Sequence, residues 1–206
     1  SIYGMYNRTE NYQSDCSYIS QIKAFKDNVS IKSCLSYTFS VSNSQGTSLI
    51  KDRPFTAEMT RSIMLLKEKP YRPRMADYRI GVFFTGREQL GEGAKTTAPV
   101  YYANRWDIQP SDTAAYLCGE KVKPTKQIVF YIDNTFPEKW KPYLREGVTQ
   151  WNELFEQIGF KDVVAAKDFP TDDPEFDPDN IKYSCVRYAP SSIENAMGPS
   201  WVCLLY

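Results

Sequence analysis

The stretch "QIVFYIDNTFPEKWKPYLREGVTQWNELFEQIGF", residues 127–160, predicts a strand followed by a long helix. Residues 127–133 form a short apolar run that is typical of a buried strand. The helix is predicted over residues 138–158: Pro137 and Pro142 stand early, where missing amide donors matter little, and Gly159 is a natural stop. Apolar side chains recur along it at spacings of three and four, which favours a core face over a binding face. This stripe consists of Trp140, Leu144, Val148, Trp151, Phe155 and Ile158.

Three short segments after the helix continue the α/β pattern. Residues 162–167, 181–188 and 196–202 each predict a strand. With the strand and helix above, they predict an α/β subdomain over residues 126–206, in which one long helix packs on a sheet.

The preceding residues, 1–125, predict a region rich in antiparallel strands. Residues 29–41 and 55–65 both alternate apolar and polar side chains, which indicates a long hairpin with one wet face. Further strands are predicted within residues 79–86 and 100–108, and then a short helical turn capped by Ser111 or Asp112. The stretch "KVKPTK", residues 121–126, marks the expected boundary or hinge. The predicted fold class is therefore α+β, with one region over 1–125 and another over 126–206.

The composition excludes several classes of function. The 206 residues carry 25 basic and 25 acidic side chains, so a nucleic-acid partner is not expected. No apolar run approaches the roughly 20 residues that a membrane-spanning helix needs. The chain has no histidine, which removes the commonest zinc ligand and every Ser-His or Cys-His pair. Its five cysteines lack C-x-x-C spacing, and we expect free, buried or half-buried thiols, with one disulfide left open.

Two charged segments are candidate ion sites, and for both the expected role is structural. The loop "DFPTDDPEFDPDN" offers clustered carboxylates for calcium, but its three prolines favour a stiff, solvated acidic loop. A basic set near residue 70 offers an anion site, but interleaved acids favour a salt-bridged loop. The acidic set is Asp168, Asp172, Asp173, Glu175, Asp177 and Asp179, and the basic set is Lys67, Lys69, Arg72, Arg74 and Arg79.

Residues 128–202 resemble bacterial (Bacteroides-type) zinc-dependent metalloproteases of the metzincin type. The resemblance rests on "FPEKWKPY", "GVTQWNELFEQIGFKDVVAAKD", "DPEFDPDNIKYS" and "NAMGPS", and upstream "RSIMLLKEKPYRPRMADYRIGVF" and "NRWDIQPSDTAAY" resemble the region before the protease domain. It implies zinc as cofactor of the full-length family, bound by an H-E-x-x-H-x-x-G-x-x-H helix. It also implies that residues 126–206 are an incomplete metzincin-like α/β subdomain with a mixed sheet, and that this sheet has an edge strand that pairs with extended peptide substrate. That strand corresponds to Ala196, Met197, Gly198, Pro199, Ser200, Trp201 and Val202.

The zinc-binding motif does not occur in these 206 residues, so no catalytic or metal-binding residue is assigned here. We therefore expect the N-terminal portion of a metallopeptidase, truncated before the zinc helix, that is itself inactive and self-associates through its exposed edge. The closing "CLLY" favours this reading. The alternative is a stand-alone, non-catalytic module that binds a peptide or protein through residues 196–202. The resemblance implies an extracytoplasmic location (periplasmic, outer-membrane associated or secreted), although no signal segment is seen.

Overall fold

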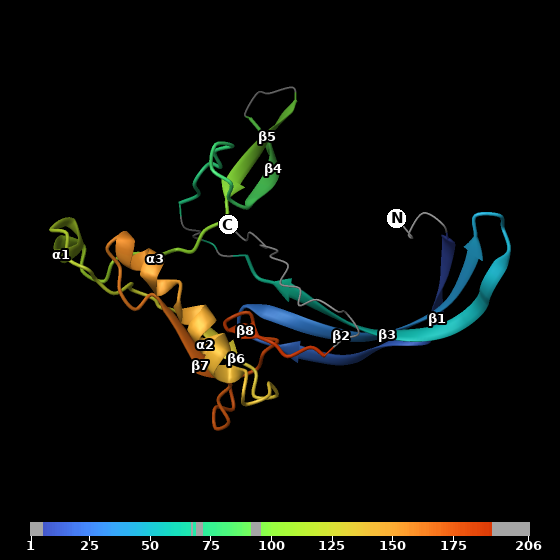
Figure 1. Ribbon diagram of the computed structural model, residues 1–206. Helices are drawn as coiled ribbons and strands as arrows, with labels where there is room; N and C mark the ends of the chain where they lie inside the picture. Colours follow the sequence, from blue (N-terminus) through green and yellow to red (C-terminus); the bar gives the residue numbers. More distant parts are fainter. Residues whose placement is uncertain (1–5, 67, 69–71, 92–95, 191–206) are drawn as a thin grey trace. The chain divides into compact units, whose positions relative to one another are not determined.

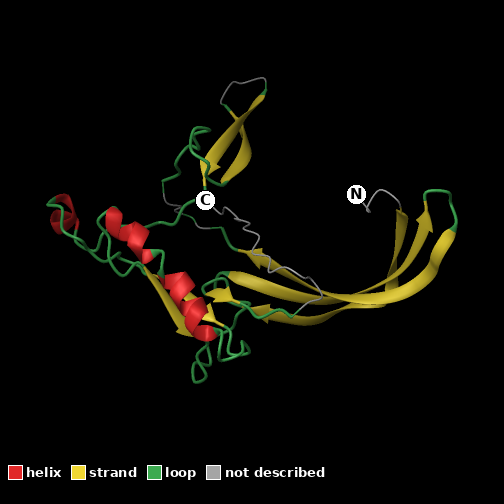
Figure 2. Ribbon diagram, viewed as in Figure 1, coloured by secondary structure: helices red, strands yellow, loops and turns green. Residues whose placement is uncertain are grey.

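A computed structural model of the chain describes residues 6–66, 68, 72–91 and 96–190 (Figure 1). Antiparallel sheets come first and a parallel sheet with helices follows, so the predicted α+β class is confirmed (Figure 2). The chain divides into two compact units. The first comprises the residues up to Leu65 together with Asp177–Lys182, and the second comprises Leu66–Phe176 and the residues from Tyr183 onward.

The first unit is built on three long antiparallel strands, β1 (Tyr6–Ala24), β2 (Asn28–Asn43) and β3 (Ser48–Met64). They pair in the order β1-β2-β3, and Figure 1 shows them running side by side and bending together. The predicted hairpin of residues 29–41 and 55–65 is confirmed. Gly46, at φ +83°, occupies the left-handed conformation that its turn requires. Strand β1 was not predicted, because its alternation is broken near residue 15.

The two faces of this sheet differ in polarity. On β2, the odd-numbered positions from Val29 to Val41 are mainly apolar, whereas the even-numbered positions from Asn28 to Ser40 are polar apart from Cys34. The loop Asp177–Lys182 lies against the polar face: the Asn28 amide donates to the Asp179 carbonyl at 2.9 Å, and its oxygen accepts from the Ile181 amide at 3.2 Å. Lys23 bonds Asp179 at 2.8 Å. Asn28 is consequently 3% exposed.

The second unit begins with the hairpin of β4 (Phe84–Leu90) and β5 (Thr97–Ala103), close to the strands predicted within 79–86 and 100–108. The short helix α1 (Thr113–Leu117) follows. Its N-cap is Asp112, whose carboxylate accepts from the Ala115 amide at 3.0 Å, so the predicted capped turn is confirmed.

A three-stranded parallel sheet follows, with the order β7-β6-β8. Its strands β6 (Ile128–Ile132), β7 (Val164–Asp168) and β8 (Ser184–Val186) lie inside or within one residue of the predicted segments. The connection from β6 to β7 contains α2 (Lys141–Thr149) and α3 (Asn152–Gln157), and α2 packs against both strands. All three described strands are parallel. The described part of the sheet is thus parallel rather than mixed as predicted, and the edge strand predicted at 196–202 lies outside the described residues.

The predicted helix 138–158 is present as these two consecutive segments. Gln150 and Trp151 keep right-handed helical angles, but the hydrogen bonds there run from Glu153 to Gln150 and from Leu154 to Trp151, three residues apart. Gly159 ends the helical stretch at φ +88°, as predicted. The side chain of Asn152 fixes α3 to the sheet, because it exchanges two hydrogen bonds with the backbone of Val164, at 2.9 and 2.8 Å.

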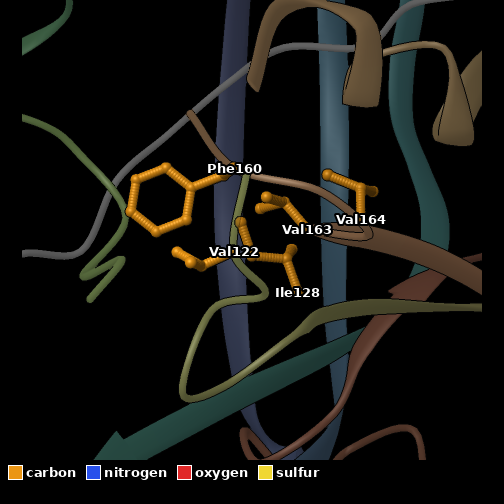
Figure 3. Close-up of a cluster of buried hydrophobic side chains, with 5 residues drawn as sticks. All are labelled: Val122, Ile128, Phe160, Val163 and Val164. Carbon is orange, nitrogen blue, oxygen red and sulfur yellow. The ribbon is translucent and has the colours of Figure 1, made fainter. Parts of the chain in front are cut away.

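The core of the second unit is a cluster of five buried side chains beside the amino ends of β6 and β7 (Figure 3). Val163 is fully buried at its centre. Val148 and Phe155 pack against the cluster from the helices. The cluster consists of Val122, Ile128, Phe160, Val163 and Val164.

Two sequence-based expectations differ from this arrangement. The apolar helix stripe is only partly core: Trp140, Trp151 and Ile158 are 44%, 59% and 57% exposed. Three strands of five, five and three residues are too small a sheet to cover the whole stripe. The expected boundary at 125/126 lies inside the second unit, where Val122 is buried and its carbonyl accepts from the Lys161 amide at 2.9 Å.

Candidate functional site

The carboxyl ends of the parallel strands are one place to look for a site, since ligands of open α/β sheets bind there. Asp133 follows β6 directly, and its backbone amide donates to the Val186 carbonyl at 3.0 Å. One carboxylate oxygen accepts from the amide and the hydroxyl of Thr135, at 3.0 and 2.8 Å. The other faces the Tyr188 amide at 3.5 Å and the Arg187 guanidinium at 3.4 Å. Asp133 thus joins the end of β6 to the residues after β8.

These contacts determine the charge of Asp133. Burial by itself raises the pKa of this carboxyl, but the bonds from Thr135, the Tyr188 amide and the nearby Arg187 guanidinium outweigh burial, and the pKa is lowered. The group is therefore ionised at neutral pH, and intrachain donors occupy both of its oxygens. A carboxylate in this state is a weak base with no free lone pair aimed at a substrate, so its role is structural.

Two further ion pairs lie near this edge. Arg145 on α2 binds both oxygens of Asp168 at the end of β7, at 2.7 and 2.6 Å. Lys141 is buried, and its ammonium reaches the exposed carboxylate of Glu138 at 2.6 Å. The edge therefore holds compensated ion pairs, which is the pattern of structural support rather than of acid–base chemistry.

A hollow of 560 Å³ lies on the sheet of the first unit, and its volume is within the range of ligand sites. Its lining is mainly aromatic and aliphatic, with Arg61 as its single charged member. No sequence pattern had pointed to it, since it depends on the pairing of all three strands. The hollow is lined by Tyr12, Ser17, Tyr18, Ile19, Ile31, Ser33, Leu35, Tyr37 and Arg61.

A smaller hollow of 340 Å³ lies on the exposed side of α2 and α3, where Gly147 leaves space beside Trp151 and Leu154. Trp151 and Leu154 are both more than half exposed. Glu153 is the only ionisable group in the lining of this hollow. It offers a shallow apolar surface and no set of reactive groups.

The acidic loop 168–179 is held by backbone caps and cations. Asp173 accepts from the Glu175 amide at 2.9 Å, and Asp177 accepts from the Asp179 amide at 2.8 Å. Asp177 and Asp179 both bind Lys23, whose pKa is raised chiefly by the Asp179 hydrogen bond. Over the described ranges, no three His, Cys, Asp or Glu side chains gather as a metal site. Asp177 and Asp179 are thus ion-paired, whereas the sequence had favoured a solvated loop.

The basic segment near residue 70 contains one ion pair within the residues that the structure describes. Arg79 forms a two-pronged ion pair with Asp77, which lowers the pKa of that carboxyl. Arg105 donates to the Arg72 carbonyl at 2.6 Å. Lys67 and Lys69 lie outside the described residues. The salt-bridged-loop interpretation is the one these contacts favour.

The four cysteines in the described part of the chain are free thiols. Cys34 is half-buried and lies opposite Tyr18, and the hydrogen bond between the two side chains raises the pKa of the Tyr18 phenol. Cys16 and Cys118 are exposed rather than buried. Cys203 lies beyond the described residues.

The residues present do not fit the zinc site that the metalloprotease resemblance implies. The chain contains no histidine, and a zinc peptidase needs three protein ligands, histidine foremost. The predicted substrate-edge strand 196–202 lies outside the described residues. Helices in the described ranges are too short and too polar to cross a membrane.

Comparison with known proteins gives one match. A family model described as "Domain of unknown function (DUF5117)" matches residues 3–111. This range covers the β1-β2-β3 sheet and the β4–β5 hairpin, and it ends just before α1. No curated protein and no solved structure matches the chain.

Proposed function

The chain belongs to the DUF5117 family, and from this premise we propose that its residues 126–206 are the first part of a metzincin-type zinc peptidase domain, with the DUF5117 region in front of it. In this proposal the complete enzyme hydrolyses peptide bonds. These residues contribute the substrate side of the cleft, and the zinc-binding helix belongs to sequence that is not among them.

One observation carries this proposal. The order β6, helical stretch, β7, β8, with all three strands parallel, is the succession of strand, long helix and further strands that the resemblance of residues 128–202 implies. Helix α2, in the crossover between β6 and β7, packs against both of these strands. The matched family has no stated activity, so the proposal rests on this order and on the sequence motifs.

The proposed role of the chain is to bind extended peptide through its backbone. An edge strand at residues 196–202 would offer its amides and carbonyls to a peptide by strand addition. The same exposed edge would let two copies pair, so weak self-association belongs to the proposal. An extracytoplasmic location also belongs to it, and fractionation of the native cells tests that point.

The catalytic part of the proposal is tested by two measurements. The pure chain with added zinc should release no peptides from casein, because it has no ligand set for the metal. Zinc-dependent, chelator-sensitive hydrolysis by this chain would contradict the proposal. The DNA downstream of the Tyr206 codon should encode an H-E-x-x-H motif, and its absence in all frames would favour the stand-alone peptide-binding module.

Strand addition is tested by a matched pair of substitutions at one position. Gly198→Pro removes a backbone amide donor, whereas Gly198→Ala keeps it. Binding of a photo-crosslinkable peptide should fall in the proline variant and persist in the alanine variant. N-methylation of the peptide backbone should weaken binding in the same way. Equal crosslinking of both variants would rule out pairing through this amide.

A further inference from the structure

The apolar face of the β1-β2-β3 sheet carries several exposed hydrophobic side chains. Antiparallel register places its apolar side chains in phase across the three strands. Ile22, Met59 and Ile63 are 60%, 43% and 62% exposed, although they face the side that a sheet normally buries. Contiguous exposed apolar surface of this kind marks an interaction site. The face, as we define it, comprises Tyr12, Ile19, Ile22, Ile31, Leu35, Tyr37, Phe39, Phe55, Met59 and Ile63.

An irregular bulge of four residues in β1 lies beside the hollow on this face. The register passes from the pair Gln13–Ser36 to the pair Tyr18–Cys34, so residues 14–17 stand opposite Leu35 alone. The Ser17 hydroxyl donates to the Gln13 carbonyl at 2.6 Å and accepts from the Ser36 amide at 2.9 Å, which fixes the bulge. Leu35 therefore has no directly paired β1 neighbour; it is 8% exposed and lines the hollow.

Aromatic rings border one end of the hollow. Tyr37 packs on Tyr12 at 5.4 Å between ring centroids and stacks on Phe55 at 5.3 Å. Because these contacts hold the rings in place, a ligand entering the hollow would meet an ordered surface and would lose little additional side-chain entropy.

Arg61 supplies the only charge in the lining of the hollow. It lies on β3 opposite Ile31. Within the part of the chain that the structure describes, no carboxylate pairs with its guanidinium. By contrast, Lys32 on the polar face is paired with Glu58 at 2.9 Å. An unpaired guanidinium beside apolar side chains is complementary to a ligand with an apolar body and a carboxylate.

We propose that this hollow binds a polypeptide segment that places aromatic or aliphatic side chains against Leu35 and Tyr37 and a carboxylate on Arg61. Tyrosine and arginine around an apolar centre are the residue types that dominate binding energy at protein–protein contacts. Surfaces that bind anionic membranes instead gather several basic side chains, and this hollow has one. The site lies in the DUF5117 region and is independent of the peptidase proposal for residues 126–206.

The test measures fluorescence anisotropy with the whole chain and three labelled peptides. Each peptide is a short alternation of Leu and Ser with one central residue, which is Glu, Gln or Lys. We expect the Glu peptide to bind about five- to tenfold more tightly than the Gln peptide. The variant Arg61→Met, which keeps an aliphatic stem, should remove this preference, and Arg61→Glu should transfer it to the Lys peptide.

Arg53→Met is the matched control, because Arg53 lies on the same strand and the same face but does not line the hollow. It should leave the preference for the Glu peptide unchanged, and circular dichroism should show all variants folded. Equal affinity for the Glu and Gln peptides, or equal losses in the two methionine variants, would overturn the proposal. Sedimentation of the chain with anionic vesicles, without peptide binding, would also overturn it, in favour of a lipid surface.

Discussion

Replacing Asp133 with asparagine tests the account of the carboxyl edge of the parallel sheet. The two bonds from Thr135, at 3.0 and 2.8 Å, are made to a carboxylate that is mostly buried. Bonds to a charged acceptor contribute about 1.5–3 kcal/mol each, and bonds to a neutral one about half as much. The long contacts to Arg187 and Tyr188 add little. Asp133→Asn should therefore lower the free energy of unfolding at pH 7 by about 2 kcal/mol.

The pH dependence of this loss has a definite sign. The pKa of Asp133 is lower in the folded chain than in the unfolded chain, where it is about 3.9. Its charge therefore stabilises the fold above about pH 4, and this contribution is lost as the pH falls through the folded pKa. The gap between the original chain and Asp133→Asn should be largest near neutral pH. It should shrink toward zero at the acid end, where both side chains are uncharged.

Urea unfolding followed by tryptophan fluorescence is the appropriate assay. Trp106, Trp140 and Trp151, the tryptophans within the described residues, belong to the second unit, so their signal reports that unit. Asp168→Asn is the control, because its ion pair with Arg145 is more than a third exposed and contributes at most about 1 kcal/mol. If Asp133→Asn cost no more than this control, or if its cost stayed constant down to pH 2, the assigned role of the hydrogen bonds would be refuted.

Three other predictions concern packing and backbone geometry. Gly159→Ala should destabilise the second unit by about 1–2 kcal/mol, because the φ of Gly159 is +88° and a Cβ there would lie 2.9 Å from the Tyr116 ring. Gly147→Ala, at an open helical position, should instead stabilise the unit by about 0.5–1 kcal/mol in the same urea assay. Val163→Ala should cost about 2 kcal/mol, because Val163 is fully buried, and an unchanged urea midpoint would contradict its place in the core. Lys23→Met should speed hydrogen exchange at the Ile181 amide by loosening the loop Asp177–Lys182, whereas Lys32→Met should not.

Local signals in the sequence were sufficient for many elements of the fold. Asp112 caps α1 and Gly159 ends the helical stretch, because capping and positive φ depend on the residue itself and its nearest neighbours. The apolar run 127–133 likewise predicted β6, because an apolar run is visible within a short window of sequence. By contrast, β1 was not predicted, since the three extra residues at its bulge, an odd number, shift its apolar alternation out of phase.

The candidate sites were less predictable, because they depend on distant contacts. The sequence showed the charges of the acidic loop but not their partner. Lys23 is separated from Asp177 by 154 positions and from Asp179 by 156 positions along the chain. The hollow requires the register of three strands and a bulge. Whether Trp151 is buried depends on how far the sheet extends beneath the helix. The apolar stripe of a helix does not predict the width of the sheet against which it packs.

The sequence by itself determined the α+β class, the strand–helix–strand order of the second unit and the absence of histidine chemistry. These follow from periodicity and composition, which are properties of short windows of residues. Only the tertiary structure decided where the units divide, which part of the helix stripe is core, and that an apolar sheet face with an unpaired Arg61 remains accessible. Burial is a property of what lies opposite a residue in space, and the register of β3 against β2 brings Arg61 to the face that carries Leu35 and Tyr37.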